Sequence, residues 1–231
     1  MVTVSLDIDP DAARPFLPEG ATGGIRHLVD TDHATTEALG FTNVPMAIWI
    51  DEDNRIVRGP ESASVERSSF KDIEIDDGWP DRIKQQLALA KSIPSHPEAY
   101  RAAIVDWAAN GANSPYVLTE AELIGRLDPR NDDEAKAVAA FELGQHLYQR
   151  AGGGAEGIAA AKDWWQMAHD LHPNNWTYKR QAWTLVTTPE GKASDLSQGP
   201  NDVFTGNWLD DVTANGGGES YVTDPQLGGS S

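Results

Sequence analysis

Cysteine is absent from all 231 residues of the sequence. Without a thiol, these residues form no disulfide, offer no thiolate to a metal ion and carry no CxxC redox centre. An apolar run of about eighteen residues, long enough to span a bilayer, is also missing. Met1 to Pro10 lacks the basic start and apolar stretch of a signal peptide. These absences predict a soluble, cytoplasmic chain that makes no membrane contact of its own.

Positive charge is scarce, with 18 Lys and Arg against 36 Asp and Glu, which gives a net charge of -18. Such a field repels phosphate backbones, so nucleic acid is not an expected partner, whereas a protein partner is compatible with it. The glycines at 152–154 lack the lysine and hydroxyl residue of a phosphate-binding loop. We therefore expect no cofactor.

The first part of the chain alternates short strand and helix patterns. Val2 to Ile8 has apolar residues at every second position, which predicts a strand. Asp9 to Phe16 follows with a helix-like composition. A second short apolar stretch, Arg26 to Val29, leads into a predicted helix from Asp30 to Leu39 that ends at Gly40.

A β-hairpin is expected next. Residues 43–50 and 55–58 are apolar runs on either side of the acidic turn Asp51 to Asn54. The polar segment from Gly59 to Gly78 has no sustained periodicity and is predicted to be a loop.

After Pro80 the apolar residues recur at the three- and four-residue spacing of helices. The predicted helices are Asp81 to Ile93, Pro97 to Ala109, Thr119 to Leu127, Asp133 to Arg150, Glu156 to Leu171 and Asn175 to Val186. The sequence thus predicts an α/β domain at 1–78, an all-α domain at 79–187 and an irregular C-terminal tail at 188–231.

One stretch of the first domain resembles the redoxin branch of the thioredoxin-like proteins, which includes the ResA and TlpA type. The resemblance rests on Leu28-Val29-Asp30, on Gly40-Phe41-Thr42-Asn43-Val44-Pro45 and on the run Trp49 to Arg58. It implies a cis bond between Val44 and Pro45, and cis bonds are inexpensive only before proline. It also implies that these two residues face a substrate or partner.

The resemblance covers only the later part of that fold, because the strand and helix that carry CxxC are not among these residues. The implied fold is a thioredoxin-like α/β domain with an incomplete sheet, in which the missing central strand leaves two apolar edges unpaired. Three explanations stay open: Met1 is a truncated or misassigned start, another chain supplies the missing strands, or the region has rearranged. We interpret the chain as a redox-inactive protein-binding module. The alternative is a fragment of a ResA-like thiol-disulfide oxidoreductase whose CxxC lies upstream of Met1, in which case an extracytoplasmic location stays open.

The helical domain resembles the tetratricopeptide repeat. The matching residues are Leu143, Gly144, Leu147, Ala161, Trp165, Ala168 and Pro173, which fit its small-and-large pattern on two antiparallel helices. Four tryptophans lie close together in the sequence: Trp164, Trp165, Trp176 and Trp183. Tryptophan anchors partner interfaces and also seals domains together, so these residues form either a partner surface or an interdomain core.

His169 and His172 have a spacing that suits two metal ligands on one helix face. No third ligand is evident, and His172 precedes Pro173 at the helix end, where a cation complements the helix dipole. We therefore expect no metal site and assign no catalytic residue.

Overall fold

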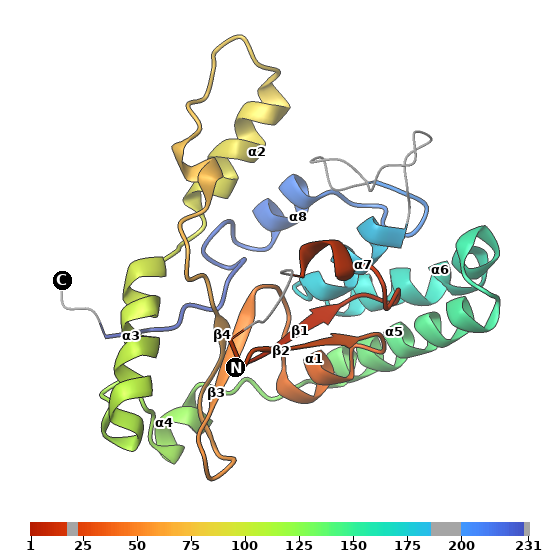
Figure 1. The fold of residues 1–231 in the computed structure, drawn as a ribbon. Coiled ribbons are helices and arrows are strands. Elements are labelled where there is room, and N and C mark those ends of the chain that lie inside the picture. Colours follow the sequence, from red (N-terminus) through yellow and green to blue (C-terminus); the bar gives the residue numbers. More distant parts are fainter. Residues whose placement is uncertain (18–22, 186–199, 229–231) are drawn as a thin grey trace. The chain divides into compact units, whose positions relative to one another are not determined.

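The computed structural model describes residues 1–17, 23–185 and 200–228 (Figure 1). These residues have a mixed α/β architecture of helices and two separate two-stranded sheets, which confirms the predicted class. The chain divides into two compact units. The first unit combines Met1–Thr42 with Arg130–Trp208, and the second combines Asn43–Pro129 with Leu209–Ser231.

This division differs from the expected consecutive domains at 1–78, 79–187 and 188–231. Each unit joins stretches that are far apart in the sequence. Side-chain contacts over such separations, such as that between Ile8 and Gln181, bring the stretches of the first unit together. Local periodicity carries no information about these contacts.

The elements follow the sequence patterns closely, with a few exceptions described below. The first unit contains β1 (Val2–Leu6), η1 (Arg14–Phe16), β2 (Arg26–Asp30), α1 (Ala34–Leu39), α5 (Asp132–Arg150), α6 (Gly154–Leu171) and α7 (Trp176–Leu185). The second unit contains β3 (Met46–Ile50), β4 (Ile56–Ser62), η2 (Ser69–Asp72), α2 (Asp81–Ser92), α3 (Pro97–Asn110), η3 (Gly111–Asn113) and α4 (Glu120–Gly125). A final helix, α8 (Trp208–Ala214), begins at the last residue of the first unit.

The α5 and α6 helices form the main core of the first unit as a helical hairpin (Figure 1). A Cβ atom on Gly144 of α5 would lie 2.6 Å from the indole of Trp165 on α6, so only glycine allows this approach. The stacked rings of Phe141 and Tyr178, with centroids 4.1 Å apart, join α5 to α7. The apolar pattern of these helices therefore produces the predicted antiparallel pair.

The predicted helix at Asp9 to Phe16 is wrong apart from the short 3-10 turn η1. The backbone N–H of Asp11 donates to the Asp9 carboxylate at 2.9 Å, which favours a turn in place of a helix. Pro15 also cannot supply a helical hydrogen bond.

The core of the second unit is centred on Trp49 of β3 and on Tyr100 and Ala103 of α3. The indole N–H of Trp49 donates to the Tyr100 hydroxyl at 3.0 Å. Beside it, the buried guanidinium of Arg58 donates to Glu61 at 2.8 Å and to the carbonyl of Tyr116 at 2.9 Å. A buried charge is tolerated here because it is both paired and hydrogen-bonded.

The β-hairpin is confirmed, but β4 continues to Ser62 into the segment predicted to be a loop. Gly59 makes this continuation possible, since it has a φ of +99° and a Cβ there would lie 2.5 Å from the carbonyl oxygen of Ala47. A glycine in a strand commonly marks such a close approach. The Val44–Pro45 bond is cis, as predicted, and so is Gly59–Pro60.

The predicted irregular tail at 188–231 is wrong for α8, and its parts at 188–199 and 229–231 lie outside the described residues. Trp208, Leu209 and Val212 are buried, at a spacing that favours one face of a helix. Earlier in this segment Val203 and Phe204 are buried in the first unit. None of the helices within the described ranges has the length and apolar character required to cross a membrane.

Candidate protein-binding surface

The two strands β1 and β2 run parallel and pair in register, with Val4 opposite Leu28. Side chains at alternate positions share one face of a sheet, so Val2, Val4 and Leu28 lie on the same face. Their exposed fractions are 56%, 39% and 53%. Parallel sheets are normally covered on both faces, which makes this exposed apolar face unusual.

The opposite face of the pair is more polar. Thr3 and His27 lie opposite each other, and the Thr3 hydroxyl lies 2.6 Å from Nδ1 of His27. Within the described ranges β1 pairs with β2 alone, so its outer edge has backbone groups that are not part of a ladder. The apolar face and the open edge together define the candidate surface, which we call the β1 surface: Val2, Val4, Leu28 and the free edge of β1.

Acidic side chains gather where the two strands end. Asp7 and Asp9 follow β1, whereas Asp30 ends β2 and Asp32 follows it. The Asp30 carboxylate accepts hydrogen bonds from the backbone N–H groups of Ala34 at 3.0 Å and Thr35 at 2.7 Å, and so caps α1. Since parallel strands end at the same edge of a sheet, this end of the β1 surface is negatively charged.

Helix α7 anchors the end of β1. The backbone N–H of Ile8 donates to Oε1 of Gln181 at 2.9 Å, and Nε2 of buried His33 lies 3.1 Å from the same oxygen. The edge of the His33 ring packs on Phe141 with centroids 5.0 Å apart. One glutamine of α7 thus holds both the chain after β1 and the loop before α1.

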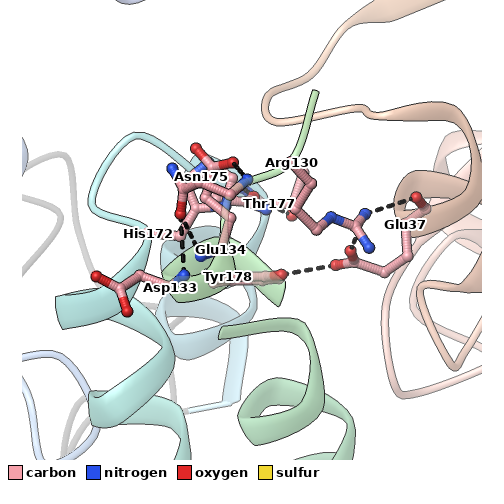
Figure 2. Close-up of polar contacts among 9 residues, drawn as sticks. Glu37, Arg130, Asp133, Glu134, His172, Asn175, Thr177 and Tyr178 are labelled. Atoms are coloured by element: carbon pink, nitrogen blue, oxygen red, sulfur yellow. Dashed lines mark hydrogen bonds and ion pairs between the residues drawn. The ribbon is translucent and has the colours of Figure 1, made fainter. Parts of the chain in front are cut away.

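A second anchor joins α1 to the helices (Figure 2). The Tyr178 hydroxyl donates to Oε1 of Glu37 at 2.7 Å, and Arg130 lies 3.2 Å from Oε2 of the same carboxylate. Arg130 also donates to the Glu37 carbonyl oxygen at 2.9 Å. Burial raises the pKa of Glu37, whereas the hydrogen bond from Tyr178 and the charge of Arg130 act against that rise. These contacts fix α1, and with it the end of β2.

Next to this anchor, the start of α5 carries a capping box. The Asn131 side chain accepts hydrogen bonds from the N–H groups of Asp133 and Glu134, both at 3.0 Å, and Glu134 accepts one from the Asn131 N–H. Nε2 of His172 lies 3.7 Å from the other Glu134 oxygen. Burial lowers the pKa of His172, and Glu134 opposes that change. The polar groups of this cluster are thus used to hold helix ends together.

An open hollow of about 800 Å³ lies beside this cluster, lined by 131–134, Lys136 and 171–174. Its lining is predominantly polar. The carboxylates in it belong to the first turn of α5, where negative charge complements the helix dipole. This arrangement is accounted for by helix capping, so the β1 surface is the stronger candidate for binding.

Val44 and Pro45, the residues implied to face a partner, lie in the second unit and are both exposed. The Pro45 carbonyl oxygen accepts a hydrogen bond from the N–H of Ala63 at 3.1 Å. They precede β3 at one end of the hairpin. The structure therefore leaves their side chains accessible to another molecule.

Three of the four tryptophans are part of the first unit's interior. Trp165 lies on Gly144, Trp176 has the Lys179 ammonium 4.2 Å from its ring centroid, and Trp183 packs on Phe204. Only Trp164 is substantially exposed, at 36%. The other three tryptophans pack against residues of their own unit, so a partner protein is not needed to explain why they lie close together in the sequence.

The two histidines considered as metal ligands have different environments. His169 is buried with its ring edge-on to Phe204, and His172 pairs with Glu134. No group of three or more His, Cys, Asp or Glu side chains suited to a metal ion occurs in the described part of the chain.

The anchors had no signal in the sequence, because Gln181 and Tyr178 act on residues more than a hundred positions away. The apolar faces of the strands, in contrast, follow directly from the alternation at Val2 to Ile8.

In comparisons with known proteins, no family model, no curated protein and no solved structure matches this chain.

Proposed function

We propose that this chain is a redox-inactive protein-binding module in which the β1 surface takes up an extended segment of a partner protein. The observation that carries the proposal is the exposure of Val2, Val4 and Leu28 on a parallel pair of strands. Two strands alone form a marginal sheet, and a third strand adds both ladder hydrogen bonds and apolar cover.

Charge defines the partner further. The end of the surface carries Asp7, Asp9 and Asp32, and the whole chain has a net charge of -18. A segment with lysine or arginine near the end that lies next to these carboxylates gains favourable electrostatic interaction and associates faster. We therefore propose an extended partner segment with alternating apolar residues and basic residues toward one end.

The rest of the module has a supporting role in this proposal. We propose that the α/β elements are thioredoxin-like with an incomplete sheet, and that α5 and α6 correspond to one tetratricopeptide-like repeat. The parallel β1–β2 pair, the antiparallel β3–β4 hairpin and the close contact of Gly144 with Trp165 support these relationships. Exposed Val44, Pro45 and Trp164 are secondary contact candidates.

Peptide binding tests the proposal. The probes are eight-residue peptides in which valine and threonine alternate, closed by two lysines or, in a matched set, by two glutamates. We expect isothermal titration to detect binding of the lysine peptides, weaker binding of the glutamate peptides and none for a peptide with proline at a central ladder position. Hydrogen exchange of the Val4 and Leu6 amides, which face the free edge of β1, is expected to slow in the complex.

The matched variants are Val4→Glu, on the β1 surface, and Ile124→Glu, at an exposed position on α4. We expect the first to abolish peptide binding and the second to leave it unchanged. Equal binding by both variants, or no binding by any peptide of either set, contradicts the proposal.

As a second candidate function, the chain forms part of a ResA-like thiol-disulfide oxidoreductase. In that enzyme the segment that pairs with β1 carries the CxxC cysteines. Among the described residues, each two-stranded pair has exposed apolar side chains, such as Val4 on β1 and Ile50 on β3, which favours an added strand. Supplying a separate CxxC-bearing strand-and-helix segment tests this candidate. A gain of disulfide reductase activity above that of the segment alone supports it.

A further inference from the structure

The last part of the second unit is an extended segment that lies along its surface. We call residues 221–227 the strap. The carbonyl oxygens of Tyr221, Thr223 and Pro225 all accept hydrogen bonds from other parts of the unit. These residues are spaced two apart, and residues at that spacing share one side of an extended chain. The strap is therefore bound along one side, as an added strand is.

The start of the strap is held through its backbone. The Asn43 side chain donates to the Tyr221 carbonyl oxygen at 2.8 Å. At the end of β4, the N–H of Ser62 donates to the Thr223 carbonyl oxygen at 2.9 Å, and the Ser62 hydroxyl accepts from the Thr223 N–H at 3.1 Å. Because every residue has a carbonyl group, these bonds select an extended path and not a particular side chain.

The end of the strap supplies the apolar contact. Pro225 is buried, and its carbonyl oxygen accepts hydrogen bonds from the guanidinium groups of Arg58 and Arg126. Leu227 packs against the core cluster around Trp49. A proline and a leucine two residues apart thus distinguish the strap from other extended segments.

The site that receives the strap, which we call the strap groove, does not depend on the strap for its own charge pairing. Its hydrogen-bond donors are Asn43, Arg58, Ser62 and Arg126. When the strap leaves, Arg58 keeps Glu61 and the carbonyl oxygen of Tyr116 as partners. The groove therefore retains a paired, hydrogen-bonded guanidinium while it is open to another segment.

A short exposed link leads into the strap. Gly218 is buried against the end of α2, where a Cβ would lie 2.9 Å from the backbone nitrogen of Ile93. Glu219 and Ser220 follow and are both exposed. The path of the chain can therefore change between the fixed Gly218 and the strap. Short links of this kind, when strained, favour exchange of a segment between chains.

We propose that the strap groove is a peptide-binding site whose occupant exchanges between copies of this chain, so that each chain of a dimer places its strap in the groove of the partner subunit. The strap of a second copy has the same residues and makes the contacts described above, so the exchange requires no new surface. Within one chain the strap has a high effective concentration at its own groove, which favours the monomer in dilute solution.

Shortening the link tests the proposal in the full chain. Deletion of Glu219 and Ser220 removes up to about 7 Å of reach, so a strap can no longer take its position in its own groove but can still reach that of a second copy. We expect sedimentation velocity to give a dissociation constant at least tenfold lower for this variant than for the unmodified chain. An excess of a synthetic peptide with the sequence of residues 219–228 should dissociate the dimer.

A second variant tests the groove itself. Leu227→Asp places a charge against the apolar cluster and should release the strap from its own groove. Fluorescence anisotropy of the labelled 219–228 peptide should then show binding at least tenfold tighter than to the unmodified chain. The matched control is Val105→Asp, at a 63% exposed position on α3, which should bind the peptide no better than the unmodified chain.

A deletion variant that stays monomeric at every concentration overturns the proposal, as does a dimer that the peptide leaves intact. A Leu227→Asp variant that keeps its circular dichroism spectrum but does not bind the peptide also overturns it. Binding of alternating valine and threonine peptides to the β1 surface is independent of all three outcomes.

Discussion

Gly144 of α5 lies directly against the indole ring of Trp165 on α6, at a distance that excludes a methyl group. Gly144→Ala would place its Cβ 2.6 Å from two ring atoms of this almost fully buried tryptophan. We expect a loss of about 1 to 3 kcal/mol in the free energy of unfolding, because the two helices must separate or the indole must leave its position. Urea unfolding of the purified variant measures this loss.

The matched control for this variant is Gly125→Ala in α4, where a Cβ meets no atom within 4 Å. Alanine has the higher helix propensity, so the control should be neutral or slightly stabilising. A Gly144→Ala variant as stable as the control would contradict the close packing of α5 on α6.

The hydroxyl of Tyr178 anchors α1 through the Glu37 carboxylate. Tyr178→Phe removes the hydroxyl that donates to the largely buried Glu37 carboxylate. Arg130 then remains as the partner of that carboxylate. We expect a loss of about 1 to 3 kcal/mol in the free energy of unfolding. Tyr148→Phe is the control, since the Tyr148 hydroxyl accepts only one exposed hydrogen bond, at 3.3 Å.

If the anchor also positions the β1 surface, Tyr178→Phe should weaken binding of the lysine peptides under conditions where the variant is still folded. Equal stability of the Tyr178 and Tyr148 variants would show that the Glu37 contact contributes nothing measurable.

Burial lowers the pKa of His169 to about 4, from the ordinary value of 6.5. Between these two pH values the unfolded chain binds a proton that the folded chain does not bind. The free energy of unfolding should therefore fall as the pH is lowered from 6.5 toward 4, by about 3 kcal/mol for this residue. Burial also lowers the pKa values of His33 and His172, which act in the same direction.

Glu37 acts in the opposite direction at the acid end, because its raised pKa makes the folded chain bind a proton more readily. The variant His169→Gln isolates the histidine contribution, and the exposed His146→Gln serves as its control. Urea midpoints between pH 4 and pH 7 should depend less steeply on pH in the first variant only. The same slope in both variants would rule out the proposed role of His169.

Disulfide reduction requires a nucleophilic thiolate, and the chain has none. In an insulin turbidity assay with dithiothreitol, we expect the purified protein to give the same rate as dithiothreitol alone. Measurable acceleration would refute the redox-inactive assignment.

Elements defined by local spacing were predictable from the sequence. The helices at Asp81 and Pro97 and the hairpin around Asp51 lie within a few residues of the expected positions. The alternation of Val2 and Val4 also indicated an apolar strand that needs a neighbour. Regular periodicity, turn chemistry and capping act over a few residues, so a single sequence records them well.

Features built from distant contacts were not predictable. Arg58 looks like a solvent-facing strand residue in the sequence, yet it is buried because Glu61, Tyr116 and Pro225 supply acceptors. Nothing close to Glu37 in the sequence indicates that Tyr178 and Arg130 will bind it. The short helix α8 is not predictable from local spacing, because glycine and polar residues surround its few apolar positions.

The interleaving of the two units has a consequence for biosynthesis. A ribosome releases the chain from its N-terminus, so the strands at Val2 and Arg26 emerge long before the α7 residues that hold them in place. The second unit also depends on a distant segment, because the carbonyl group of Pro225 that accepts a hydrogen bond from Arg58 lies 167 positions later in the chain. The strands of each unit are therefore synthesised long before the segments that complete their packing, and a nascent chain exposes their apolar residues until those segments emerge.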